Sequence, residues 1–249
     1  MPPFEDHFSK RAHEYARSRP SHPRELFDYL ATVTPRRRLA WDCGTGNGQA
    51  ARELVRHFDQ VVGTDASAEQ LSHAVPHERI DYRVELAEEA SLEAGSVDLV
   101  TAAVAVHWFD LERFYATVRR VSAAHGILAV WSYHLPVISS AVDRAVEHYH
   151  SDVLGGYWPE RFQHVVGRYR TLPFPFEELD PPRFEMRGEW ELAQLVGFLE
   201  SWSAAQRYQE ERGHPAPSLI TPRLAQAWGE PGTRRPVRWP IFLRVGRVR

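Results

Sequence analysis

The sequence is poor in cysteine and lysine. Cys43 is the single cysteine among 249 residues, which excludes an internal disulfide and is typical of a protein from a reducing compartment. Lys10 is the only lysine, so arginine provides every other basic side chain. The net charge of −3 leaves no cationic field that would attract nucleic acid or an anionic membrane.

The sequence also lacks a long apolar run and a recognisable leader. Its longest apolar run, Leu99 to Val106, is too short to span a bilayer. Residues 1–6 contain neither the basic nor the apolar part of a secretory signal. These features predict a cytoplasmic protein with no membrane or nucleic-acid partner. They are consistent with a monomer or a homodimer.

What the sequence does contain is the composition of a globular α/β protein, with 43% hydrophobic and 25% charged residues. Up to residue 132, apolar runs typical of buried strands alternate with helical patterns, which predicts a doubly wound parallel sheet. The expected strands lie at residues 39–41, 60–65, 80–84, 96–105 and 126–131. Ser67 and Asp110 are expected to cap helices.

After residue 132 this alternation ends. Residues 133–180 contain two helical patterns and a proline-rich connector, which suggests an insertion that caps the sheet over the substrate. A strand is expected over 183–190, and strict alternation of apolar residues over 237–245 predicts a final strand. Residues 1–35 read as a helical lid, and residues 1–249 as one domain.

A glycine-rich stretch lies between the first expected strand and the helix that follows. Gly44, Gly46 and Gly48 occupy alternate positions, where they allow a tight turn and close approach of the backbone to a ligand. Asp42 precedes them, and Asp65 ends the second strand about twenty residues on, where a carboxylate can bind both hydroxyls of a ribose.

Two ligands compete for this loop. Residues 46–51 fit the dinucleotide pattern G-x-G-x-x-G/A, which leaves an NAD(P)-dependent oxidoreductase open. Residues 44–48 instead fit a G-x-G-x-G loop. Asp42 would repel a pyrophosphate and favour a ligand with a cationic amino group and a sulfonium, as in S-adenosylmethionine.

The stretch 39–48, the acidic strand end at 62–65 and the segment 96–100 resemble motifs of class I S-adenosylmethionine-dependent methyltransferases. Segments 15–23, 106–110, 202–208 and 237–247 resemble the small-molecule subgroup that includes trans-aconitate methyltransferases. The resemblance implies a Rossmann-like α/β fold. It would have a seven-stranded sheet, parallel except for one antiparallel C-terminal strand, with helices on both faces and a helical cap after the fifth strand.

The resemblance also implies a binding site for S-adenosylmethionine, which the reaction would convert to S-adenosylhomocysteine. The glycines would line the methionine and ribose side, Asp65 would hold the ribose, and no metal is expected. Together with Asp42 from the charge argument, the predicted cofactor-binding residues are Asp42, Gly44, Thr45, Gly46, Gly48, Asp65, Ala66, Ser67, Ala87, Glu88 and Ala103. Gln70 stands where this family often has methionine.

The methyl acceptor is expected at the carboxyl ends of the fourth and fifth strands, where open α/β sheets place substrates. His107 could bind the acceptor or remove its proton, or it could be a buried histidine packed beside Trp108. The predicted catalytic residues are His107, Tyr15 and Trp108, and the predicted substrate-binding residues are Arg19, Trp131, Tyr133 and Arg207. Tyr15 could instead belong to the core, and Arg207 to the surface.

The function expected from these residues is methyl transfer to a small organic molecule, at a carboxylate or hydroxyl oxygen. Proximity and alignment supply much of the catalysis of such a transfer. The alternatives are the oxidoreductase, an N- or C-methyltransferase of a secondary metabolite, and a binding module without turnover.

Overall fold

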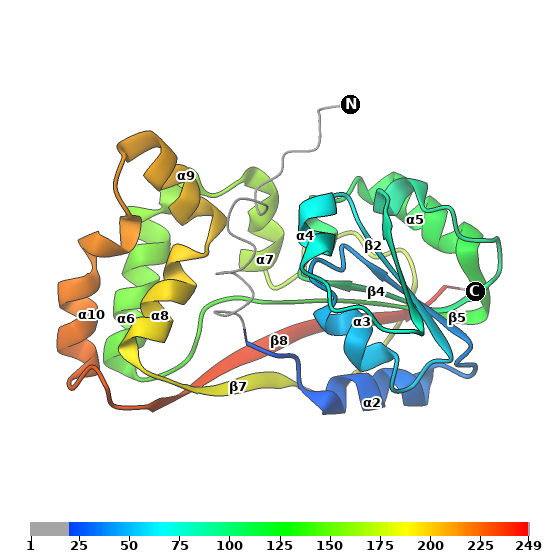
Figure 1. Ribbon diagram of the computed structural model, residues 1–249, viewed down its shortest axis with the longest axis horizontal. Helices are drawn as coiled ribbons and strands as arrows, with labels where there is room; N and C mark the ends of the chain where they lie inside the picture. The colour runs from blue at the N-terminus through cyan, green and yellow to red at the C-terminus, as the bar shows by residue number, and fades with distance from the viewer. Residues whose placement is uncertain (1–19, 249) are drawn as a thin grey trace.

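A computed structural model of the chain describes residues 20–248 (Figure 1). The predicted site residues Tyr15 and Arg19 therefore lie outside the described residues, as does most of the predicted lid. The described part of the lid contains the helix α2 (Arg24–Val33).

Five parallel strands form the centre of the sheet, in the order β3-β2-β1-β4-β5. Their bounds are β1 (Leu39–Cys43), β2 (Gln60–Asp65), β3 (Ile80–Val84), β4 (Val97–Ala103) and β5 (Ser122–Tyr133). The C-terminal strand β8 (Arg235–Arg247) is antiparallel to β5, and β6 (Glu177–Leu179) pairs with its outer edge. The predicted Rossmann-like sheet with an antiparallel C-terminal strand is confirmed.

The described sheet has eight strands rather than the expected seven, because β6 was not expected from the sequence. The long strand β8 pairs with β5, β6 and β7. Only its second half pairs with β5, from Ile241 onward. Its first half, Arg235 to Pro240, pairs with β7 (Glu185–Trp190), which is the strand expected over 183–190. β8 thus changes partners halfway along its length.

Neighbouring residues of each central strand face opposite sides of the sheet, and both sides are covered. Ala40 of β1 belongs to a core cluster with α2 and α3 (Gln49–Leu54). Trp41 and Cys43 face the other side and pack in a cluster with α5 (Leu111–Val121). Asp110 caps α5, and Ser67 caps α4 (Ala68–Ser72), as predicted.

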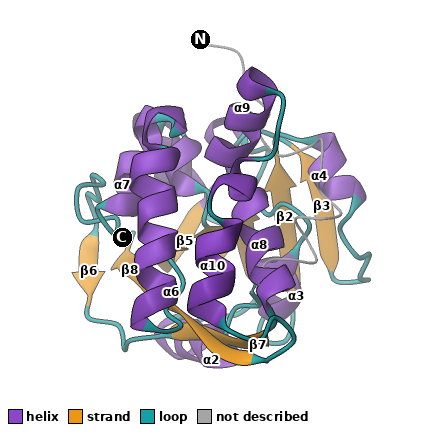
Figure 2. Ribbon diagram, turned by 90° about the vertical axis from the view of Figure 1, so that its left-hand side faces the viewer, coloured by secondary structure: helices purple, strands orange, loops and turns teal. Residues whose placement is uncertain are grey.

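A helical layer gathers beyond the carboxyl ends of the central strands, on the left of Figure 1, and Figure 2 looks onto it. Its members are α6 (Ser140–His148), α7 (Gln163–Val166), α8 (Leu192–Glu200), α9 (Ser203–Arg212) and α10 (Thr221–Trp228). α10 packs on both α6 and α8.

This layer is built from two stretches of chain. The expected insertion, 133–180, supplies α6 and α7, whereas α8, α9 and α10 come from later in the sequence. The end of that insertion is not part of a cap, because Glu177–Leu179 forms β6 at the sheet edge. No helix of the described part of the chain is long and apolar enough to cross a bilayer.

Candidate active site

The glycine loop has a backbone that only glycine adopts without strain. Gly44, Gly46 and Gly48 have φ angles of +61°, +56° and +80°, all in the left-handed region. A Cβ at Gly44 would lie 2.6 Å from the Cβ of Ala105, and one at Gly48 would lie 2.2 Å from the Tyr82 hydroxyl oxygen. At Gly46 the nearest atom would be Gln70 Oε1, 3.8 Å away, so the loop is most open at its centre.

Asp42 lies beneath this loop, with its side chain fully buried. Its carboxylate accepts hydrogen bonds from Thr45 Oγ1 at 2.6 Å and from Thr101 Oγ1 at 2.7 Å. Burial raises the pKa of Asp42 to about 6, against the lowering effect of the two hydroxyls. Asp42 therefore ties the loop to β4 and, at neutral pH, keeps negative charge beneath the glycines.

Asp65 occupies the end of β2 and organises the turn on the other side of the loop. The Gly46 amide donates to its Oδ2 at 2.8 Å, and the Ser67 amide donates to its Oδ1 at 2.9 Å. Ala66 lies half-buried between them. The acidic strand end and the glycine loop thus form one hydrogen-bonded unit, as their spacing suggests.

The predicted pair Ala87 and Glu88 falls in the short helix η2 (Ala87–Glu89) after β3. Ala87 is buried, and the Glu88 carboxylate accepts a hydrogen bond from the Asp110 amide at 2.7 Å. Glu88 therefore links η2 to the residue that caps α5.

The end of β4 carries backbone strain. Ala103, the predicted contact for the methionine part of the cofactor, is its last residue. Val104 follows with a φ of +56°, which is rare for a β-branched residue and costs roughly 1–3 kcal/mol. Its amide donates to the Trp131 carbonyl at 2.8 Å. This turn sends the chain away from the sheet and into η3 (Val106–Trp108), the short helix that carries His107.

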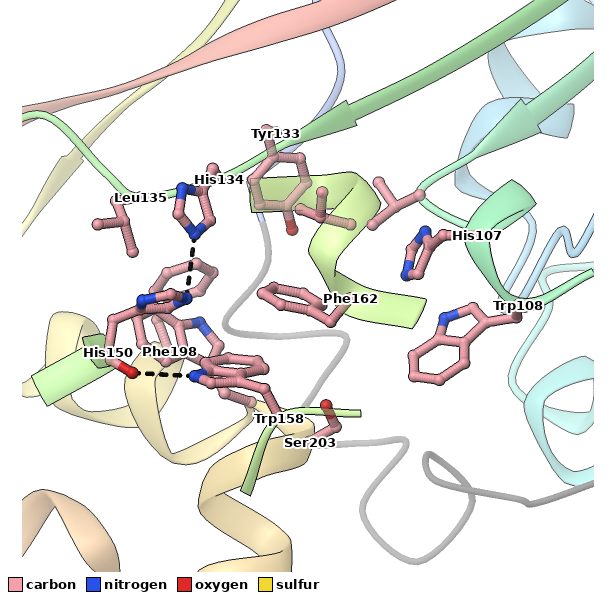
Figure 3. Close-up of a pocket in the computed structure, with 13 residues that line it drawn as sticks. His107, Trp108, Tyr133, His134, Leu135, His150, Trp158, Phe162, Phe198 and Ser203 are labelled. Carbon is pink, nitrogen blue, oxygen red and sulfur yellow. Dashed lines mark hydrogen bonds between the residues drawn. The ribbon is translucent and has the colours of Figure 1, made fainter. Parts of the chain in front are cut away.

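A cavity opens between this turn and the helical layer (Figure 3). The empty space between its walls is about 560 Å³ and includes open solvent. Its lining is mainly aromatic and includes Trp108, Tyr133, Trp158, Phe162 and Trp202, with three histidines, His107, His134 and His150.

His107 is 3% exposed and lines this cavity. Its Nδ1 forms a 2.8 Å hydrogen bond with the hydroxyl of Tyr169, which is itself fully buried. Burial, with a smaller contribution from His164, lowers the pKa of His107 to about 3, so the ring is neutral at physiological pH. The ring centroid of Trp108 lies 4.9 Å away.

His134 and His150 face each other on the far side of Phe162, as Figure 3 shows. Their Nε2 atoms are 3.1 Å apart and share a hydrogen bond, so one ring donates and the other accepts. Burial lowers the pKa of each to about 4. This neutral pair contributes polarity without charge.

The substrate residues predicted from sequence are only partly brought together. Tyr133 lines the cavity, whereas Trp131 is buried two residues earlier in β5 and packs against Phe27, at a centroid distance of 6.1 Å. Trp131 is thus a core residue rather than a wall of the cavity. Arg207 lies on α9 and is not among the residues that line the cavity in the described part of the chain.

Several lining residues were not identified from the sequence. His150 and Trp158 come from short helical segments without a clear periodicity. Phe162 ends the short helix η6 (Glu160–Phe162), and the helical pattern that begins there forms only the four-residue helix α7. Tyr169 has a φ of +57° and follows Arg168, with a φ of +56°, so two successive left-handed residues bring it to His107. An unusual density of aromatic residues over 149–169 was the only available signal.

Comparison with known proteins indicates the same class of protein as the glycine loop and the order of the strands do. A family model described as a methyltransferase domain matches residues 41–130. A Dictyostelium discoideum protein named as a methyltransferase is 31% identical over 204 residues, which cover 80% of this chain and 78% of that protein. A Saccharomyces cerevisiae protein named as an S-adenosylmethionine-dependent methyltransferase is 30% identical over 131 residues, 49% of this chain and 45% of its own.

Among solved structures, one described as a type II methyltransferase from Anaeromyxobacter dehalogenans superimposes with a TM-score of 0.85 at 41% identity. The match covers 92% of this chain and 98% of that one. The loop, the acidic strand end and the sheet order define a nucleotide-binding fold of the class I methyltransferase type. The chain belongs to the S-adenosylmethionine-dependent methyltransferases.

Proposed function

We propose that the protein transfers a methyl group from S-adenosylmethionine to an oxygen atom of a small organic molecule bound in the aromatic cavity. The observation that carries this proposal is the contact between Gly44 and Ala105, where a Cβ on the glycine would come within 2.6 Å. Ala105 lies between Val104 and His107, which both line the cavity. The glycine loop therefore packs against the segment that lines the cavity, so the proposed donor and acceptor sites are neighbours.

The residues of the loop fit the cofactor. The left-handed glycines leave a cradle without side chains, and the carboxylate of Asp65 is held by two amides at the strand end, where it can bind ribose hydroxyls. The negative charge of Asp42 beneath the loop suits a cationic ligand better than a pyrophosphate. Gln70, near Gly46, is a further contact candidate.

S-adenosylmethionine supplies an electrophilic methyl group when bound. The work left to the protein is to align an acceptor and keep water out, and these effects can supply much of the rate. The stacked rings of Trp158 and Phe162, with Trp202 tilted against Trp158, provide an apolar enclosure. His107 provides a neutral hydrogen-bonding group at its rim. A likeness to the trans-aconitate subgroup, a cytoplasmic location and a monomeric or homodimeric state stay predictions.

Thermal unfolding with S-adenosylmethionine, S-adenosylhomocysteine and NADH tests the donor site. We expect both sulfur nucleotides to raise Tm, since a ligand at a hundred times its Kd stabilises the folded state by about 2.7 kcal/mol. Incubation with labelled S-adenosylmethionine and a panel of hydroxyl, carboxylate, amine and carbon acceptors should then add one methyl mass to an oxygen compound. Stabilisation by NADH alone would overturn the proposal.

Asp65 gives a residue-level test of the donor site. Asp65→Ala and Asp65→Asn are each expected to weaken S-adenosylmethionine binding at least tenfold, because the carboxylate is lost while Asn keeps its shape. Calorimetric titration measures the change. Asp81→Ala is the control, since it removes an exposed β3 carboxylate paired with Arg83. Retained affinity in both Asp65 variants would remove Asp65 from the site.

A further inference from the structure

The cavity is an aromatic slot, one wall of which is made of rings that pack directly on one another. Trp158 and Phe162 stack with their centroids 4.1 Å apart and their planes within 13° of each other, and Trp202 lies 5.6 Å from Trp158. An aromatic ligand can extend this packing by a stacked or edge-on contact with the rings that line the cavity.

The slot is also uncharged. Within the described part of the chain, no Asp, Glu, Lys or Arg lines it, and its three histidines are neutral at physiological pH. Arg161 and Arg168 lie nearby but are engaged elsewhere: Arg161 donates to the Trp108 carbonyl, and Arg168 lies over the ring of Phe242. A buried carboxylate would lose its hydration here without a paired cation, which is costly.

His107 offers the slot a polar atom. His107 Nδ1 is used by Tyr169, and its Nε2 has no hydrogen-bond partner among the described residues. We propose that the methyl acceptor is an uncharged phenol that stacks in this slot and donates its hydroxyl hydrogen to Nε2 of His107. This proposal rests on the proposed function and names its substrate class.

Tyr169 holds the other side of the His107 ring. Its hydroxyl and His107 Nδ1 are 2.8 Å apart and share a hydrogen bond. When Nδ1 carries the ring proton and donates it to Tyr169, Nε2 is left as an acceptor for the phenol hydroxyl. Tyr169 is a positioning residue, because it acts only through His107.

The transfer balances without a metal or redox partner. The phenol oxygen forms a bond to the methyl carbon as the carbon–sulfur bond breaks, and sulfur keeps the electron pair. The hydroxyl proton passes to His107 Nε2 and then to water. A neutral imidazole of low pKa orients the hydroxyl in the ground state and takes its proton only as the oxygen gains positive character.

The first test measures binding without the cofactor. The probes are 2-naphthol, 2-naphthoate and 2-methoxynaphthalene, which share one ring system and differ in the polar group. Calorimetric titration of the full chain should give a Kd for 2-naphthol at least tenfold below that of either other compound. Tighter binding of 2-naphthoate, or equal binding of all three, would overturn the proposal.

Two variants of His107 separate its two nitrogen atoms. His107→Gln places an amide near the position of Nε2, whereas His107→Asn places one near Nδ1 and leaves the cavity side empty. We expect His107→Asn to lose at least tenfold in 2-naphthol affinity, and His107→Gln to lose less. The reverse order, with both variants folded by circular dichroism, contradicts a contact through Nε2.

Tyr169→Phe tests the positioning role. It removes the partner of Nδ1 but no atom of the slot, so kcat with 2-naphthol should fall about tenfold while KM changes less than threefold. An unchanged kcat overturns the role. Methyl transfer to carboxylates but not phenols defeats this inference alone, whereas absence of S-adenosylmethionine binding, or of transfer to any acceptor, defeats the proposed function.

Discussion

Tyr82 determines which residue can stand at position 48. Its ring packs against Gly63, and its hydroxyl oxygen occupies the space where a Cβ at Gly48 would lie. That hydroxyl is buried without a hydrogen-bond partner among the described residues, and burial raises its pKa to about 12. The tyrosine thus closes the floor of the glycine loop at the cost of an unsatisfied polar atom.

Gly48→Ala is expected to destabilise the fold by about 3 kcal/mol, because left-handed backbone strain adds to a collision with Tyr82. Urea denaturation measures the change. Gly95→Ala is the matched control: it has a φ of +71° with nothing within 4 Å, so it should lose only the strain, about 1 kcal/mol. Adding Tyr82→Phe should recover part of the loss at position 48. Equal losses in the two glycine variants contradict the collision.

Where a predicted site residue lies depends on its position along a strand. The alternation of β5 puts Trp131 and Tyr133 on one face, but only Tyr133, the last residue of the strand, lines the cavity, while Trp131 is covered by Phe27 of α2. Asp42 and Asp65 could be located because motif spacing fixes both. Tyr169 could not, since its contact with His107 joins residues 62 positions apart.

Among the elements, β8 pairs with three other strands, β5, β6 and β7. Arg244, near its end, donates to the carbonyls of Tyr169 and Leu172, and its guanidinium also pairs with Glu178 of β6. One side chain therefore joins the sheet edge to the segment that brings Tyr169 to His107. The strand β6 could not be predicted from the sequence, because it has three residues in a proline-rich stretch. It forms by pairing with β8, and its own residues show no alternation of apolar and polar side chains.

Arg244→Lys should lower the free energy of unfolding by about 2 kcal/mol, because lysine cannot reproduce the planar fork that bonds two carbonyls and a carboxylate at once. Methyl transfer should fall as well, as the support of Tyr169 loosens. The control is Arg247→Lys, which alters an exposed pair with Glu177 and should cost less than 0.5 kcal/mol. Chemical denaturation of both variants gives the comparison, and equal effects would contradict this role of Arg244.

At the scale of the whole molecule, the sheet and the helical layer enclose an interior that contains several neutral histidines. Burial lowers the pKa of His22, His134 and His150 to about 4 and that of His107 to about 3, from an ordinary value near 6.5. His22 lies just before α2, His107 and His134 follow the ends of β4 and β5, and His150 belongs to the segment after α6. The sequence predicted the parallel sheet, because the alternation of strand and helix patterns can be recognised locally along the chain. It could not predict how the helical layer buries these histidines, because that layer depends on packing between helices that are distant in the sequence.

Stability should therefore decrease on acidification from pH 6.5 towards pH 4. In that window the unfolded chain binds protons that the folded histidines do not, so lower pH favours unfolding. Asp42 opposes this, since its raised pKa of about 6 makes the folded state bind a proton between pH 6 and 3.8. Each histidine loses about 1.3 kcal/mol and Asp42 recovers about 0.8 kcal/mol, so we expect a net loss of about 4 to 5 kcal/mol between pH 7.5 and 5.5. Urea titrations across this range measure it, and a flat or rising profile contradicts the neutral interior.

Cys43 ends β1 directly before the glycine loop, fully buried, and burial raises the pKa of its thiol. A protonated thiol out of contact with solvent reacts slowly with alkylating reagents. The native chain thus behaves as a cysteine-free background for site-specific labelling. One cysteine introduced on the exposed side of α9 and another on α4 would carry a pair of spectroscopic probes, and Cys43 would not need to be replaced.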